Sequence, residues 1–591
     1  MMPGTSHNDR PQTQSPPLPA PLPMSREEMD RLGWDALDVL LVSGDAYVDH
    51  PSFGTALIGR WLQSKGYRVG VVAQPRWDTP EDIMRLGRPR LYAGITAGAL
   101  DSMLAHYTAF RKLRHDDAYT PGNRHGARPN RACIVYTGLM RNAFPGLPVV
   151  LGGVEASLRR ATHYDFWTDK IRRSLLLDSK ADLLVYGMGE RAALEAARRL
   201  ESLPEGNNPV EALRGIPGTA FAVSKLEPLQ ESGLVPQDDG LVRLPGHEEI
   251  SAEPKALMTA TLALERQVHQ GARWAVQASG TRHVVFAPPA APLNTGELDS
   301  LHALPFTRRP HPLHRERIPA ADMIQFSITA HRGCAGGCTF CSITMHQGRQ
   351  IQSRSPESLL QEARTLTKHP DWKGSISDVG GPTANMWGAR CTADPSVCRR
   401  TDCLVPVVCP HFKTEDEALV NLLREMAGVD GVRHLRVASG VRYDLDGGGG
   451  VFLKALINEF VGGQLKVAPE HASDKVLKLM RKPSFHRFEQ FMALFSNASC
   501  GVGKEQYVIP YLISAFPGCT DDDMRDLARW LRERGWRPRQ VQCFIPTPGT
   551  VATAMYHTCA DPRGNPIYVA KSDAERLRQH RILLPVEGRE C

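Results

Sequence analysis

The chain has 591 residues, of which 42% are hydrophobic and 23% are charged, and this composition excludes a disulfide-stapled mini-protein and allows two or three globular domains. It carries 71 basic and 64 acidic residues, and the net charge of +7 is too small for this length to indicate nucleic-acid binding. Thirteen cysteines, seven of them between Cys334 and Cys409, favour metal ligation in a reducing cytoplasm over a disulfide framework.

Residues 1–24 are rich in Pro, Ser, Thr and Gln without an apolar run, which predicts a disordered tail rather than a signal peptide or anchor. No stretch of about 18 uncharged apolar residues follows, so no transmembrane helix and no membrane partner is predicted. Residues 25–225 alternate apolar runs with helical patterns, which predicts an α/β domain with a Rossmann-like or flavodoxin-like parallel sheet. Its predicted strands lie in residues 36–44, 67–74, 90–97, 147–153 and 181–189.

The loop after the first predicted strand reads SGDAYVDHPSFG and contains Asp49 and His50. Cobalamin-binding domains carry D-x-H-x-x-G at a comparable loop, but Asp49 and His50 are adjacent here. We therefore interpret this loop as a helix-entry cap or as a contact with a substrate domain.

Residues 226–320 contain scattered prolines and charges and one helical segment near 252–270, which indicates a connector or wrapping segment. From residue 321 the strand–helix rhythm resumes and predicts an open (β/α)6 barrel up to residue 560, with the functional site at the carboxyl ends of its strands. The six predicted barrel strands lie in residues 323–330, 372–381, 432–442, 463–471, 506–518 and 539–549.

Residues 331–342 read HRGCAGGCTFCS, which places Cys334, Cys338 and Cys341 in a C-x3-C-x2-C spacing after the first barrel strand. Thiolates are the usual ligands of iron–sulfur clusters, and three of them leave one iron of a [4Fe–4S] cluster open for a small molecule. The intervening glycines let the loop curl, and Phe340 is placed to cover one side of the site. The alternative is three unrelated buried cysteines or part of a zinc site, although zinc spacings place cysteines in C-x2–4-C pairs.

Glycines and polar residues end the next two barrel strands. Gly380 and Gly381 end the second strand, where backbone amides and carbonyls can meet the ammonium and carboxylate of a ligand. Ser439 and Arg442 end the third strand, where they can hold a ribose or a carboxylate, since a guanidinium matches a carboxylate bidentately. A plain turn and a solvated arginine are the alternatives.

Lys466 and Glu470, in the segment LKVAPEH of the fourth barrel strand, are the catalytic candidates. Glu470 can act as an acid or base or bind a ligand hydroxyl. The alternatives are a solvated loop carboxylate and a lysine that only extends its ammonium into water.

A second cysteine group follows the Gly380–Gly381 turn in a C-x6-C-x4-C-x5-C spacing. Four thiolates within 19 residues can hold an auxiliary [4Fe–4S] cluster or a zinc ion, whereas buried apolar thiols are the alternative. The group forms a Cys-rich insertion at residues 391–409 and consists of Cys391, Cys398, Cys403 and Cys409.

The cluster loop, with an aromatic residue before its third cysteine, resembles that of the radical S-adenosylmethionine (SAM) superfamily. Residues 24–571 also resemble the YgiQ family of uncharacterised bacterial radical SAM proteins, whose pattern includes the second cysteine group. Relatives continue past the position of Cys591, so we expect residues 561–591 to be a truncated C-terminal tail. The motifs that carry the resemblance are GDAYVDHPSFG, LGGVEASLRR, LPFTRRPHP, GGPTANM, CPHF, VASGVRYD, LKVAPEH and ISAFPGCT.

The resemblance implies a cytoplasmic enzyme whose [4Fe–4S] cluster cleaves SAM reductively to a 5′-deoxyadenosyl radical, with the methionine amine at the Gly380–Gly381 turn. Its expected partners are an unknown substrate and a reductant such as flavodoxin or ferredoxin. One alternative is methylthiotransferase-like sulfur insertion or methyl transfer with a second cluster. A non-catalytic iron–sulfur redox protein or a zinc-stabilised binding protein is the other, and neither requires SAM to bind and split.

Overall fold

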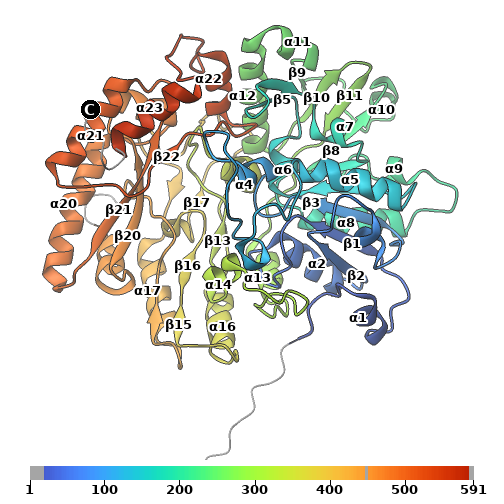
Figure 1. Ribbon diagram of the computed structural model, residues 1–591, viewed down its shortest axis with the longest axis horizontal. Coiled ribbons are helices and arrows are strands. Elements are labelled where there is room, and N and C mark those ends of the chain that lie inside the picture. Colours follow the sequence, from blue (N-terminus) through green and yellow to red (C-terminus); the bar gives the residue numbers. More distant parts are fainter. Residues whose placement is uncertain (1–18, 446–449, 585–591) are drawn as a thin grey trace, which may run out of the picture.

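The computed structural model describes residues 19–445 and 450–584. Two α/β parts lie side by side, an N-terminal part built on one large sheet and a C-terminal partial barrel (Figure 1). Among the described residues, no helix has the length and the apolar character needed to cross a bilayer.

The N-terminal sheet has nine strands in the order β2-β1-β3-β4-β7-β8-β11-β10-β9. Strands β5 (His163–Asp165) and β6 (Lys170–Arg172) form a separate hairpin. Without them, the first five strands of the sheet are parallel and follow the flavodoxin-like order 2-1-3-4-5, so the predicted sheet type is confirmed. The strands are β1 (Val39–Ser43), β2 (Val69–Ala73), β3 (Tyr92–Thr96), β4 (Val149–Gly152), β7 (Leu183–Val185), β8 (Thr219–Val223), β9 (Leu241–Leu244), β10 (Trp274–Ser279) and β11 (Arg282–Phe286).

Helices cover both faces of this sheet, which explains why its strands are continuously apolar. Successive residues of β1 point to opposite faces, so Val39 packs into one core and Leu40 into the other. The helices α2 (Gly54–Ser64) and α8 (Glu190–Glu201) contribute to the first core, and α5 (Ala132–Ala143) contributes to the second.

Residues 226–320 are not a connector, which corrects the sequence analysis. They supply strands β9 to β11, which extend the sheet, and the helix α12 (Pro254–Gln270), whose residues pack into both the N-terminal core and the barrel core. The prolines between the strands obscured their rhythm. Gly280 at φ 57° in the two-residue turn between β10 and β11 was the hairpin signal that could have been used.

The expected disordered tail at residues 1–24 is corrected in part. Residues 1–18 lie outside the described residues, but Leu22 and Met24 are buried, and the carbonyl of Pro23 accepts a hydrogen bond from the N–H of Val71 at 2.9 Å. The end of this segment therefore packs against the N-terminal sheet.

The partial barrel has six parallel strand positions in sequential order, which confirms the predicted (β/α)6 topology. Its first strand is shorter than expected because Met323 and Ile324 belong to the helix α14 (Pro319–Ile324). The strands are β12 (Ser327–Thr329), β15 and β16 (Ser375–Ile376 and Asp378–Gly380), β19 (His434–Leu435), β20 (Gln464–Glu470), β21 (Tyr507–Ser514) and β22 (Gln542–Cys543).

Helices on the outside of the barrel bury one apolar core together with the strands. The expected tail at residues 561–591 is wrong for its described part, because Arg576 and Gln579 of the last helix are fully buried against the barrel. Residues 585–591 lie outside the described residues. The helices are α16 (Pro356–Thr367), α17 (Asp416–Ala427), α18 (Val451–Ala455), α19 (Asp474–Met480), α20 (Phe485–Val502), α21 (Asp521–Glu533), α22 (Val551–Thr558) and α23 (Asp573–Leu583).

The loop that contains Asp49 and His50 joins the two parts of the molecule through one arginine. Asp49 accepts a hydrogen bond from the N–H of Thr307 at 2.9 Å, and His50 Nε2 lies 3.1 Å from Arg308 Nη1. Arg308 also forms a buried ion pair with Glu362 of α16. The interpretation of this loop as an interdomain contact agrees with this geometry.

Candidate functional site

The cluster loop, residues 333–342, lies at the carboxyl end of β12, between the short strand β13 (His331–Arg332) and the helix α15 (Ile343–Gln347). A Cβ atom placed on Gly336 would lie 3.6 Å from Sγ of Cys334 and 3.9 Å from Sγ of Cys338, so these two thiols face one point. Burial, with the other two thiols close by, raises the pKa of Cys341 to about 12. At neutral pH such a thiol stays protonated unless a metal replaces its proton. The loop therefore offers three neighbouring sulfur donors.

The second cysteine group is only partly gathered. Burial raises the pKa of Cys403, and the nearby Cys391 adds to this rise. Cys391 is exposed, whereas Cys403 and Cys409 are buried in a small apolar core that also contacts Cys334. Cys398 lies in the wall of a separate cavity. Among the described residues, no three His, Cys, Asp or Glu side chains are grouped as ligands of a single ion. An iron–sulfur cluster binds each thiolate through a different iron, so its cysteine sulfurs lie farther apart than those around a single zinc ion.

The Cys-rich insertion is bonded directly to the cluster loop. Asp402 Oδ2 accepts a hydrogen bond from the backbone N–H of Gly337 at 2.6 Å. Gly337 has no room for a side chain, because a Cβ atom there would lie 2.1 Å from the carbonyl oxygen of Thr401. The insertion is thus one wall of the cluster loop.

Two cations flank Cys338. Arg442 Nη1 lies 3.8 Å from its Sγ, while Nε and Nη2 donate to the carboxylate of Asp444 at 2.7 and 2.6 Å. Burial raises the pKa of Cys338, and Lys482 and Arg442 oppose that rise. Because Asp444 already occupies the guanidinium fork, the geometry does not support Arg442 as a ligand of a SAM carboxylate. Lys482, which the sequence analysis missed, and Arg442 both favour the thiolate form of Cys338.

The Gly380–Gly381 turn lies beside the cluster loop because β12 and β16 are neighbours. The Gly380 carbonyl already accepts a backbone hydrogen bond at 2.7 Å, so the open part of the turn begins at Gly381. Gly381 approaches the chain so closely that a Cβ atom would lie 2.6 Å from the carbonyl oxygen of His331. Thr383 Oγ1 lies 3.8 Å from Cys334 Sγ. The turn and the cluster loop therefore adjoin.

Ser439 is held by a carboxylate that the sequence analysis missed. Its hydroxyl donates to Asp378, as does its N–H at 3.0 Å. Asp378 stands two residues before Gly380, so strand alternation places both on one face of the sheet. A polar strand residue two positions before a double glycine was the available signal.

A cavity of about 560 Å³, here called the interdomain cavity, opens between the carboxyl ends of the N-terminal strands and those of β12 and β16. Asp378, Gly381 and Ser439 line its barrel side, and the loops after β1, β3, β4 and β7 line the other side. In open α/β sheets ligands bind at this position. Arg332 of the barrel donates to Glu190 of α8 at 2.6 Å, and this buried ion pair holds the two sides together.

Phe340, Lys466 and Glu470 do not line the interdomain cavity. Phe340 packs edge-to-face on Phe516, with ring centroids 6.2 Å apart, as part of the barrel core. Lys466 is exposed on the face of β20 opposite to the buried residues on either side of it. Glu470 is buried at φ 68° with Oε1 3.5 Å from Lys482 Nζ, and burial raises its pKa although Lys482 opposes this.

Comparison with known proteins assigns both parts of the chain. Residues 21–327 match the family described as Radical SAM N-terminal, and residues 328–531 match the Radical SAM superfamily. The first match ends at the start of β12, in agreement with a domain that extends through β11.

Similar proteins cover nearly the whole chain. UPF0313 protein GSU2873 of Geobacter sulfurreducens is 51% identical over 575 residues, 96% of this chain and 93% of the relative. UPF0313 protein YgiQ of Escherichia coli K12 is 44% identical over 624 residues, 96% of this chain and 84% of the relative. Among solved structures, the radical SAM methyltransferase TsrM from Kitasatospora setae has a TM-score of 0.47 and 15% identity, covering 92% of this chain and 82% of TsrM. The chain belongs to the UPF0313 (YgiQ) family and is an enzyme of the radical SAM class.

Proposed function

We propose that Cys334, Cys338 and Cys341 bind a [4Fe–4S] cluster and that SAM binds in the interdomain cavity against the Gly380–Gly381 turn. The convergence of the thiols beside this turn is the observation that carries the proposal. When bound and reduced, the cluster supplies the electron that splits SAM into methionine and a 5′-deoxyadenosyl radical, which removes hydrogen from a substrate.

The residues around the turn have distinct tasks in this proposal. The backbone from Gly381 onward offers polar groups to the ammonium and carboxylate of SAM. Ser439, oriented by Asp378, is placed to meet a ribose hydroxyl. Glu470 is the stronger candidate for holding a proton, since its pKa is raised, whereas Lys466 is only exposed, on the face of β20 opposite to its buried neighbours.

The Cys-rich insertion supports one second candidate function. Its hydrogen bond to Gly337 places Asp402 and the following Cys403 next to the cluster loop. An auxiliary cluster in this insertion would suit methylthiotransferase-like sulfur insertion or methyl transfer. We further expect a cytoplasmic location and a low-potential reductant such as flavodoxin or ferredoxin.

The test is anaerobic reconstitution followed by iron and sulfide counting and an assay of dithionite-dependent 5′-deoxyadenosine release. Wild type should bind about four irons and release the product, and about eight irons would add the auxiliary cluster. Cys338→Ala should lose release, whereas the matched variant of the exposed Cys500, Cys500→Ala, should keep it. Zinc without iron, or a cluster that never cleaves SAM, would contradict the proposal.

A further inference from the structure

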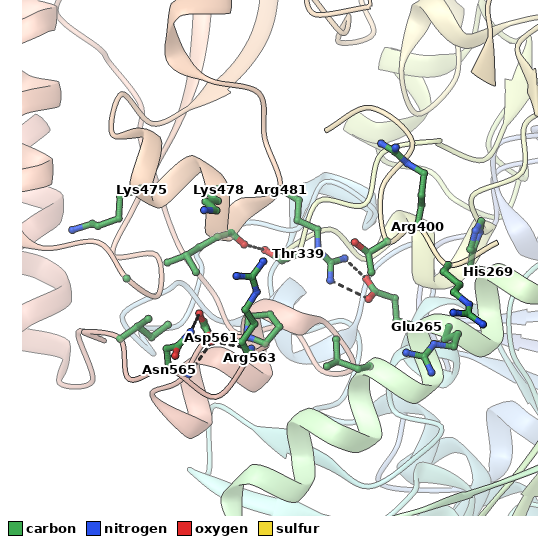
Figure 2. Close-up of a pocket in the computed structure, with 18 of the residues that line it drawn as sticks. Glu265, His269, Thr339, Arg400, Lys475, Lys478, Arg481, Asp561, Arg563 and Asn565 are labelled. Carbon is green, nitrogen blue, oxygen red and sulfur yellow. Dashed lines mark hydrogen bonds and ion pairs between the residues drawn. The ribbon is translucent and has the colours of Figure 1, made fainter. Parts of the chain in front are cut away.

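We propose that a basic cavity behind the cluster loop is the docking site of an acidic, one-electron-donating protein; this inference rests on the proposed function. The cavity, here called the basic groove, has a volume of about 970 Å³. Figure 2 shows its walls: Lys475 and Lys478 stand at one side, Arg400 and His269 at the other, and Arg481 lies between them. Segments that are far apart in the sequence, from α12 to the loop after α22, form it together.

The lining of the basic groove is strongly and openly cationic. Eight arginines and lysines line it against two carboxylates, and Lys475 is paired at 2.7 Å with a third, Asp523, so this surface carries an excess of five positive charges in a chain whose net charge is +7. One of the carboxylates, Glu265, is already bound to Arg481 at 2.6 Å. Within the described part of the chain, no carboxylate lies within 4.0 Å of the side-chain nitrogens of four of the cations, which are Arg266, Arg399, Lys478 and Arg563.

Two further arginines of the groove contact neutral groups. Arg349 donates to the carbonyl of Arg400 at 2.9 Å and to Cys403 Sγ at 3.1 Å. Arg400 donates to the carbonyl of Val407 at 2.9 Å. These bonds fix the guanidinium groups without neutralising them, so the groove attracts an anionic partner.

The groove reaches the back of the cluster loop. Thr339 lines the groove, and its N–H donates to the carbonyl of Met480 at 3.1 Å. Arg481 Nη1 donates to the carbonyl of Gly337 at 3.2 Å, and the Arg481 carbonyl lies 4.0 Å from Cys338 Sγ. A cluster held by Cys338 would therefore lie one residue behind the groove wall.

The position of the groove favours an electron donor over a substrate. No described residue lines both the basic groove and the interdomain cavity. A substrate must touch the carbon of SAM that attacks it, on the side of the Gly380–Gly381 turn. An electron needs no such contact and can cross one residue of protein. One electron passes from the reduced flavin or iron–sulfur group of the donor to the cluster, so the donor is oxidised by one electron, the cluster is reduced by one, and no atom moves.

The test compares two triple charge reversals in the full-length protein. The groove variant combines Arg399→Glu, Lys478→Glu and Arg563→Glu. The control variant combines Arg364→Glu, Arg487→Glu and Arg532→Glu. These three arginines are exposed on outer helices, do not line the groove and form no ion pair with a described residue. The probe is a recombinant bacterial flavodoxin, whose Kd is measured by fluorescence anisotropy at low and high salt.

The groove variant should raise the flavodoxin Kd roughly tenfold or more at low salt, with a smaller effect at high salt, because screening weakens exposed charge pairs. Flavodoxin-driven 5′-deoxyadenosine release should fall with it, while dithionite-driven release stays at the wild-type level. The control variant should change neither.

Equal flavodoxin affinity in both triple variants would overturn the proposal. The proposal would also be overturned if wild type binds a single-stranded RNA oligonucleotide, the groove variant does not, and flavodoxin fails to displace the RNA. That result would identify the groove as a nucleic-acid surface. Absence of SAM cleavage with either reductant in wild type would contradict the proposed function instead, and the flavodoxin Kd would still decide the docking site.

Discussion

Gly337→Ala should detach the Cys-rich insertion from the cluster loop. The added Cβ atom would lie 2.1 Å from the carbonyl oxygen of Thr401, and real Cβ atoms keep at least 3.0 Å from such neighbours, so the two segments must separate by about 0.9 Å. Forced overpacking costs about 1–3 kcal/mol. Weakening the hydrogen bond of Gly337 to Asp402 costs roughly 1.5–3 kcal/mol more. The sum, about 2.5–6 kcal/mol, shifts the docking equilibrium of the insertion by roughly two to four orders of magnitude.

Gly336→Ala is the matched control, since its three nearest neighbours would be side-chain atoms and not backbone: Nη1 of Arg442 at 3.2 Å and two thiols beyond 3.5 Å. The assay is amide hydrogen exchange of the peptide spanning residues 391–409 in metal-free protein, so the readout does not depend on cluster assembly. Exchange should be much faster in Gly337→Ala than in Gly336→Ala or wild type. Equal exchange in all three would refute the argument that the insertion depends on this close approach.

Two other predictions concern the contact between the N-terminal part and the barrel. Glu190→Gln leaves Arg332, whose side chain is only 6% exposed, without its carboxylate, so the melting temperature should fall by an amount that corresponds to about 3–5 kcal/mol. The double variant Glu190→Leu with Arg332→Met should recover most of this loss. An unchanged melting temperature in Glu190→Gln would contradict the prediction. Burial lowers the pKa of His346 to about 4, with Arg332 and Arg160 adding to the effect and Glu190 opposing it. Because this value lies below the ordinary histidine pKa near 6.5, burial of neutral His346 contributes fully to the free energy of unfolding above pH 6.5. This contribution declines as the pH falls toward 4, by about 2 kcal/mol at pH 5. Melting curves at pH 7 and pH 5 should therefore show a smaller acid-induced loss in His346→Gln than in wild type, and equal losses would show that His346 does not titrate this way.

Some features followed from local sequence alone. The strand β1 could be located because VLLVS is apolar on both faces, as a parallel strand between two helix layers must be. The cluster loop was identifiable because its three thiols are close in sequence and its glycines permit the curl. Residues 226–320 misled because β11 pairs with β8, 60 or more residues away, and β10 pairs with β9, 33 residues away. These partners are set by the sheet rather than by local pattern.

The sequence by itself determined the order of the elements, the sulfur donors and the glycine turn, because these depend on residues near one another along the chain. Only the tertiary structure decided which charges meet. Asp444 binds the guanidinium of Arg442, and Lys482 lies close to both Glu470 and Cys338. Cations from five segments between Arg266 and Arg563 line the basic groove. Such pairings depend on distance in space, which sequence spacing does not fix once the chain has crossed from one sheet to another.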